Sequence, residues 1–118
     1  MADVSSSEFI KGYTKIILCA YLYKGRNYLY AVIKQLLKDG HGYLRITNPS
    51  ALMIMKEMEA EGFVTFELDF SETNLGRKYF ALTEAGKEFY LKNRDGYVNS
   101  LKRMQSIIIG GDEDESER

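Results

Sequence analysis

The spacing of apolar residues predicts two helices near the beginning of the chain. Apolar side chains recur at helical spacing over residues 8–23, and Gly25 can cap the C-terminal end of this first helix. Asn27 can cap the N-terminal end of a second helix, which ends at Asp39 and Gly40. Three apolar side chains of the second helix fall on one face: Tyr30, Ile33 and Leu37.

A proline marks the start of a third helix. Asn48 can serve as its N-cap, and Pro49 takes the first helical position, where the missing N–H of proline costs nothing. The helix should continue to about Glu61, and Gly62 stops it.

Strict alternation replaces the helical spacing after Gly62. Over residues 63–70 the apolar side chains lie on one face and the polar ones on the other. Residues 71–76 are rich in turn formers, and alternation resumes over residues 77–82. The pattern predicts a two-stranded hairpin with a loop longer than the tightest turns.

A long helix completes the pattern. Thr83 can cap its N-terminal end, and it should reach about Ile108, although Gly96 weakens it by roughly 1 kcal/mol relative to alanine. An apolar stripe with the spacing of a helix pair runs along its second half: Tyr97, Leu101, Met104 and Ile108. Such a stripe would be exposed on a monomer, so we expect a second copy to cover it in a two-fold dimer.

The order of the elements is helix, helix, helix, hairpin, long helix. This order is typical of a winged helix-turn-helix, mainly α with a small β-hairpin, followed by a long C-terminal dimerisation helix. The third helix is then the candidate recognition helix and the hairpin is the wing. We expect a flexible N-terminus over residues 1–7, a winged-helix DNA-binding domain over 8–83, the dimerisation helix over 84–109 and a disordered acidic tail over 110–118.

The charge distribution agrees with a nucleic-acid partner more than the total charge does. The formal net charge is −1, but the last seven residues, DEDESER, hold five acids and one arginine. The other residues hold 15 bases and 12 acids, a net charge of +3. A mildly basic body is compatible with DNA binding.

Three segments resemble the PadR family of bacterial transcription regulators. They are FIKGYTKIILCAYLYKGRNYLYAVIKQL at residues 9–36, NPSALMIMKEMEAEGFV at 48–64 and GRKYFALTEAGKEF at 76–89. The third segment, a wing strand that runs into the start of the last helix, is the most specific. The resemblance implies a dimeric transcription regulator, a repressor that occludes an operator in double-stranded DNA and responds to a small molecule.

The chain departs from the family pattern where base pairs would be recognised. Leu29 precedes Tyr30 where the family usually has glycine, and the recognition helix holds one base, Lys56, beside three glutamates. On the family pattern the side chains that face the core are Ala51, Ile54, Met55 and Met58. Those that face a DNA groove are Ser50, Leu52, Met53, Lys56 and Glu57. Leucine and methionine cannot make bidentate contacts to base edges, so this helix has few side chains that can recognise bases.

The candidate DNA contacts come from the second and third helices, the connector before the third helix and the wing. They are Asn27, Tyr28, Tyr30, Arg45, Thr47, Ser50, Leu52, Met53, Lys56, Arg77 and Lys78. The bases among them can neutralise phosphates without recognising sequence. Alternatively, Arg77 and Lys78 lie on a solvated edge of the hairpin, where basic side chains discourage pairing with another strand. The acids Glu67, Asp69 and Glu72 would repel phosphate if they lie on the side of the hairpin that faces DNA.

The resemblance also implies a small-molecule site at the dimer centre, lined by an aromatic residue of the last helix. Tyr97 is the best candidate, with Tyr13, Leu101, Met104 and Ile108 as further residues of a dimer and effector cleft. A flat aromatic effector would suit a cleft of tyrosines. The alternative for most of the nine tyrosines is packing in the core and the dimer.

Little in the sequence indicates an enzyme. Cys19 lies in an apolar helix, His41 is the single histidine, and no Cys/His cluster has metal-ligand spacing, so we expect no cofactor and no metal. A single cysteine, no apolar run that could span a bilayer and no signal-peptide pattern favour the cytoplasm. The alternative to a DNA-binding regulator is a winged-helix module that binds protein. The small number of base-recognising side chains on the third helix and the acidic wing favour this alternative.

Overall fold

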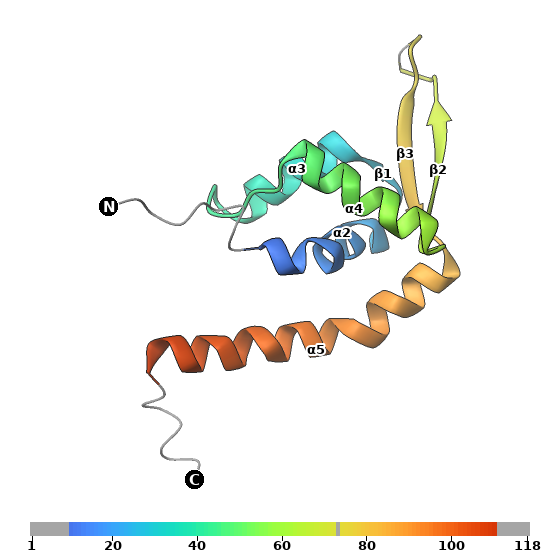
Figure 1. Ribbon diagram of the computed structural model, residues 1–118. Coiled ribbons are helices and arrows are strands. Elements are labelled where there is room, and N and C mark those ends of the chain that lie inside the picture. The colour runs from blue at the N-terminus through green and yellow to red at the C-terminus, as the bar shows by residue number, and fades with distance from the viewer. Residues whose placement is uncertain (1–9, 73, 111–118) are drawn as a thin grey trace.

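A computed structural model of the chain describes residues 10–72 and 74–110. Its elements follow the order helix, helix, helix, hairpin, long helix, as predicted (Figure 1). The helices are η1 (Lys11–Tyr13), α2 (Thr14–Tyr23), α3 (Leu29–Asp39), α4 (Asn48–Ala60) and α5 (Glu84–Ile109). The strands are β1 (Asn27–Tyr28), β2 (Val64–Asp69) and β3 (Arg77–Leu82). Within the described ranges, no helix is both long and apolar enough to cross a membrane.

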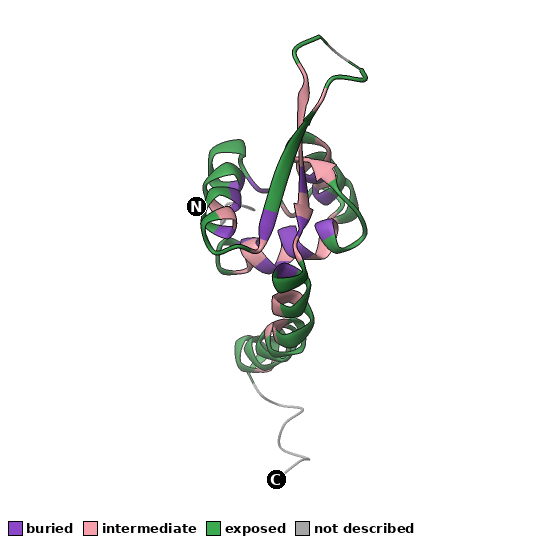
Figure 2. Ribbon diagram, turned by 90° about the vertical axis from the view of Figure 1, so that its right-hand side faces the viewer, coloured by how far each residue is buried: buried purple, intermediate pink, exposed green. Residues whose placement is uncertain are grey.

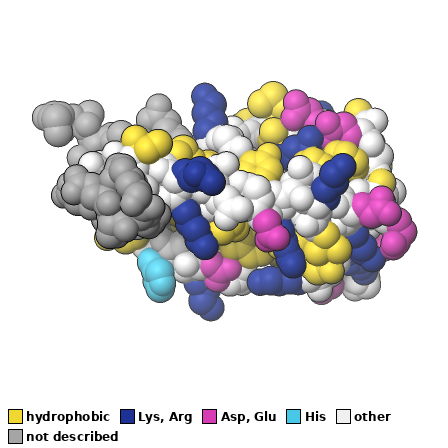
Figure 3. All heavy atoms as spheres, turned by 90° about the horizontal axis from the view of Figure 1, so that it is seen from below, with side chains coloured by type: hydrophobic (Ala, Val, Ile, Leu, Met, Phe, Trp, Pro, Cys, Tyr) yellow, Lys and Arg dark blue, Asp and Glu magenta, His cyan; other side chains and the backbone are white. Residues whose placement is uncertain are grey.

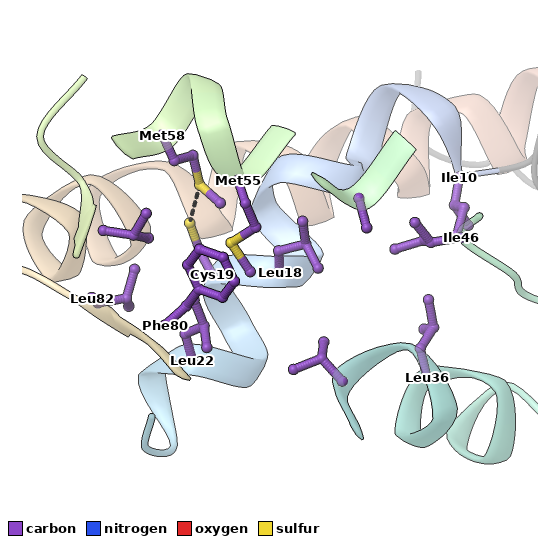
Figure 4. Packing of buried hydrophobic residues seen from close by; sticks show 13 residues of the cluster. Ile10, Leu18, Cys19, Leu22, Leu36, Ile46, Met55, Met58, Phe80 and Leu82 are labelled. Atoms are coloured by element: carbon purple, nitrogen blue, oxygen red, sulfur yellow. Dashed lines mark hydrogen bonds between the residues drawn. The ribbon is translucent and has the colours of Figure 1, made fainter. Parts of the chain in front are cut away.

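The core lies where α2, α3, α4 and the base of the sheet meet. Leu18, Met55 and Met58 are fully buried there, beside Phe80 of β3 (Figure 4). Val64 of β2 belongs to the same cluster. Val32 and Leu36 of α3 belong to the same cluster, so burial of one apolar cluster fixes the position of the wing relative to the helices.

The N-terminal ends of the helices differ from the prediction. The first helix was expected from residue 8, but its described part begins with a 3-10 turn at Lys11 and becomes α-helical at Thr14, while residues 1–9 lie outside the described residues. The third helix begins at Asn48, and its N-cap is Thr47, whose hydroxyl accepts from the backbone N–H of Ser50. The prediction of Asn48 as the cap was wrong by one residue, since either side chain is a good cap.

The prediction of Asn27 as the cap of the second helix was wrong. Asn27 and Tyr28 form a two-residue strand, β1, that pairs antiparallel with Phe80 and Tyr79 of β3. The helix therefore begins at Leu29, after Tyr28, with no side-chain cap. Its buried side chains are Val32 and Leu36, so the buried face is rotated away from Tyr30, which is 60% exposed.

The wing is the hairpin of β2 and β3, and β3 lies between β1 and β2 in the sheet. Val64 opposes Leu82, Phe66 opposes Phe80 and Leu68 opposes Lys78, so these side chains share one face of the sheet. Only the base of this face is buried. The distal side chains Phe66, Leu68 and Phe70 stay exposed, because the hairpin projects beyond the helices (Figure 1).

Helix α5 begins where the wing ends and turns back under the head. As predicted, Thr83 is its N-cap, and the Thr83 hydroxyl accepts from the backbone N–H of Gly86. The helix runs along α2 on the side opposite α3 and α4, and its second half passes beyond α2 (Figure 1). This second half is almost entirely exposed (Figure 2). Gly110, with a φ of 112°, ends the helix.

Candidate nucleic-acid interface and α5 groove

The outward face of α4 carries the side chains that the sequence placed there. Ala51, Met55 and Met58 are fully buried, as expected. The exposed side chains of the opposite face include Ser50, Leu52, Met53, Lys56 and Glu57. This face therefore offers one hydroxyl, one ammonium and one carboxylate between apolar side chains, few of the donors and acceptors that recognise base edges.

A groove of about 350 Å³ lies at the N-terminal end of α4. Arg45 and Thr47 reach it from the connector, Ser50 and Met53 from α4, and Lys11 from the turn before α2. No ion pair is found for Lys11 or Arg45 among the described residues. Lys11 escaped prediction because it precedes Arg45 by 34 residues and only the packing of α2 against α4 brings the two to one groove.

One face of the wing holds a network of arginine, tyrosine and carboxylate. The Arg26 guanidinium donates to Glu67 at 2.8 Å and to Asp69 at 3.0 Å, and it lies 4.2 Å from the ring centre of Tyr79. Hydrogen bonds from Ser71 and then Arg26 lower the pKa of Asp69 to about 2, so this carboxylate stays charged. Because both carboxylates form ion pairs with Arg26, the charge of this arginine is already compensated.

The charge of Arg77 is also compensated by a carboxylate. Its guanidinium donates to Glu72 at 2.8 Å and lies 4.4 Å from the ring centre of Tyr28. Tyr28 in turn packs edge-on against Tyr79. The structure thus pairs Arg77, a candidate phosphate contact, with Glu72, one of the acids that the sequence analysis named as able to repel phosphate.

The other face of the wing is apolar around a single lysine. Lys78 lies 3.9 Å above the ring of Phe66, and Phe66, Leu68 and Phe70 are 43%, 56% and 57% exposed. Lys78 has no carboxylate partner among the described residues. It is therefore the wing base that remains available to a phosphate.

A second groove, of about 370 Å³, follows the outward face of α3. Tyr28, Tyr30, Lys34 and Lys38 line it together with Ala31 and Gln35. The sequence prediction included Tyr28 and Tyr30 but missed both lysines. The signal was present, since Tyr30, Lys34 and Lys38 are spaced four residues apart and must share one helix face.

A third groove, of about 450 Å³, lies between η1 and α5 on the far side of the head. Tyr13 and Tyr97 meet there edge to face with their ring centres 5.5 Å apart, and Asn93, Gly96 and Ser100 complete the lining. The Tyr13 hydroxyl also lies 3.9 Å from the Met104 sulfur. The structure thus brings three of the five predicted cleft residues together, while Leu101 and Ile108 are exposed side chains of α5 that do not line the groove.

The thiol of Cys19 is not a reactive group. Cys19 is completely buried and contacts the Met58 sulfur at 3.6 Å. Burial raises the pKa of the Cys19 thiol to about 11, so it stays protonated and unreactive. Among residues 10–72 and 74–110, no group of His, Cys, Asp and Glu side chains could hold a metal ion.

Comparisons with known proteins agree on one family. The model of the transcriptional regulator PadR-like family matches residues 17–92. The chain is similar to a transcriptional regulator from Clostridium thermocellum, with 20% identity, a TM-score of 0.75 and coverage of 87% of this chain and 97% of the other. It is also similar to a PadR family regulator from Eggerthella lenta, with 20% identity, a TM-score of 0.71 and 86% of both chains covered. No curated protein matches the chain.

A further similar structure contains DNA. Bacillus subtilis PadR, in complex with operator DNA, is 23% identical to the chain with a TM-score of 0.60. The match covers 66% of this chain but only 44% of the Bacillus protein. Similarity at this identity shows a shared fold.

Proposed function

Because the chain belongs to the PadR-like family of transcriptional regulators, we propose that it binds operator DNA as a homodimer and represses transcription by occluding that operator. The observation that carries this proposal is the exposed face of α4 together with the groove at its N-terminal end, whose Lys11 and Arg45 form no ion pair among the described residues. In this proposal residues 8–83 bind DNA, residues 84–109 join two copies, residues 110–118 form an acidic tail, and the regulator acts in the cytoplasm.

Recognition of the operator rests on α4 and the groove at its N-terminal end. Ser50, Leu52 and Met53 would touch base edges and thymine methyl groups, with Lys56 near the phosphates. Lys11 and Arg45 would hold the backbone beside the N-terminus of the helix, where the positive end of the helix dipole favours a phosphate. With few bidentate contacts available, sequence preference should be modest and should depend on DNA shape.

A salt series tests DNA binding. We expect the protein to shift a labelled duplex from the region upstream of its own gene, with an affinity that falls by about 0.9 log units per log unit of salt for each phosphate contact. A random duplex of equal length and base composition is the control, and it should bind more weakly. Absence of binding to either duplex, even at low salt, would remove the proposal.

The runner-up function is a winged-helix module that binds a protein. The specific observation in its favour is the wing, whose arginines are compensated and whose distal face exposes Phe66, Leu68 and Phe70. Exposed apolar patches of this kind mark interaction sites. A protein that fails to bind DNA in the salt series but folds and dimerises would favour this second function.

The groove between Tyr13 and Tyr97 is the proposed effector site. A planar aromatic molecule could stack on the two rings, with the hydroxyl and amide groups of Ser100 and Asn93 nearby. Its binding would change the angle between the two heads, since the groove lies between η1 of the head and the dimerisation helix.

Replacing Tyr97 with alanine should weaken the binding of a planar aromatic probe such as acridine by about fivefold or more, because one stacking ring is lost. Fluorescence titration without DNA measures this. Tyr43→Ala is the matched control, because Tyr43 is 75% exposed in the connector after α3. Equal affinities of the two variants would remove the groove from the proposal.

A further inference from the structure

The groove on the outward face of α3 has the chemistry of a phosphate site. The side chains of Lys34 and Lys38 offer ammonium groups, and those of Tyr28 and Tyr30 offer hydroxyls. No carboxylate lines the groove. The acid nearest in sequence, Asp39, accepts hydrogen bonds from Tyr21 of α2 at 2.6 Å and from Gln35, a residue of the groove, at 2.8 Å. These hydrogen bonds, and to a smaller extent the charges of Lys24 and Lys38, lower the pKa of Asp39. Among the described residues, no ion pair joins Asp39 to Lys38.

The lysines of this groove differ in charge balance from the two arginines that contact the wing, here called the wing arginines: Arg77 of β3 and Arg26 before β1. Arg26 and Arg77 each have a carboxylate partner within 3.0 Å. No such partner is found for Lys34 or Lys38 among the described residues, and Lys34 lies 5.6 Å from the ring centre of Tyr30. A cation without a partner gains more from a phosphate than one that must first give up a carboxylate.

The position of the groove suits a long polyanion. Helix α3, which carries the groove, lies on the side of α2 opposite α5 (Figure 1). Tyr28 links the groove to the wing, because its ring centre lies 4.4 Å from the Arg77 guanidinium. Lys34 and Lys38 are one helical turn apart, about 6 Å along α3, so their ammonium groups can reach different phosphates of one polyanion.

We infer that the α3 groove, with Lys34 and Lys38, holds the phosphodiester backbone of duplex DNA, and that it takes over the positioning role which the compensated wing arginines do not supply. This inference rests on the proposed function and adds to it a surface that lies beside the recognition helix and not on it. Because phosphate contacts do not depend on sequence, the groove contributes equally to binding of operator and of random DNA.

The test is the salt dependence of binding to a fluorescein-labelled duplex of mixed sequence, about 30 base pairs long so that two heads can reach it. The full-length K34Q/K38Q variant should bind more weakly than the unaltered protein. Its slope of log affinity against log salt should be smaller by about 2 if one head contacts DNA and by about 4 if both do.

Two controls make the result specific. The K92Q/K102Q variant removes the same charge from α5, on the other side of the head, and should keep the unaltered slope. The E72Q/R77Q variant removes the wing ion pair at constant net charge and should also keep it.

A K34Q/K38Q slope equal to that of the unaltered protein, which itself binds, overturns the inference and leaves the proposed function standing. If the slope of log affinity against log salt becomes smaller by about 1 or more in the E72Q/R77Q variant, the claim that Arg77 does not contact phosphate is overturned. No binding by the unaltered protein overturns both the inference and the proposed function.

Discussion

Replacing Gly86 with alanine should destabilise the fold by about 3 kcal/mol, the upper end of the range for an overpacked core. Gly86 is buried in the first turn of α5, and a Cβ atom there would overlap the carbonyl oxygen of Phe63 and lie 3.0 Å from Cδ2 of Leu82. Thermal unfolding followed by circular dichroism measures the loss, which corresponds to a fall in Tm of roughly 12–24 °C.

The carbonyl group of Phe63 cannot move aside easily, because two hydrogen bonds from Thr83 hold the backbone at Phe63 and at the preceding residue. It accepts a hydrogen bond from the backbone N–H of Thr83 at 2.9 Å, and the Thr83 hydroxyl donates to the neighbouring carbonyl of Gly62 at 2.6 Å. The start of α5 and the turn between α4 and β2 are thus held together around this glycine. Relief of the overlap would have to break one of these hydrogen bonds.

Gly96→Ala is the matched control, since it makes the same change in the same helix. A Cβ atom at Gly96 has no neighbour within 4 Å, so alanine should stabilise the helix by roughly 0.5–1 kcal/mol through its higher helix propensity. If both variants unfold at the temperature of the unaltered protein or above it, the close approach at Gly86 is not a constraint on the fold.

The elements that the sequence predicted best are those defined by local chemistry. Thr83 was expected to cap α5 and does so, and the alternation after Gly62 marked both wing strands to within one residue. Alternation and capping depend on neighbours in sequence, so the chain itself contains the information. Strand β1 was missed for the opposite reason, because two residues pair with a strand more than 50 positions away and carry no periodicity.

The DNA-binding surface shows the same contrast between features set by local sequence and features set by distant residues. The outward face of α4 could be derived from helical spacing, and so could the lysine row of α3, had its four-residue repeat been weighed. The pairing of Arg26 with Glu67 and Asp69 could not be derived, since it joins residues 41 and 43 positions apart through a bend of the chain. As a result, the sequence indicated a wing that meets phosphate, and the structure shows the arginines of that wing already engaged.

The second large effect is expected from Leu101→Asp, which should convert the proposed dimer to monomers. Leu101 is 49% exposed on α5, beside Met104 at 41% and Ile108 at 82%, and this run of apolar side chains extends beyond the head. Seen from the α5 side, hydrophobic side chains lie between basic ones over this face (Figure 3). Burial of an unpaired carboxylate costs several kcal/mol, and a two-fold interface would contain two copies of it.

Sedimentation across a range of protein concentrations measures the effect, which we expect to be a rise in the dimer dissociation constant of at least a hundredfold, from about 3 kcal/mol of lost association energy. Asn99→Asp adds the same charge to the same helix outside the stripe and should leave the dimer intact. The monomer should also lose DNA affinity, because it presents one recognition helix in place of two. Dimers of unchanged affinity in the Leu101→Asp variant would show that another surface joins the two copies. If so, the exposed second half of α5 would need a different partner.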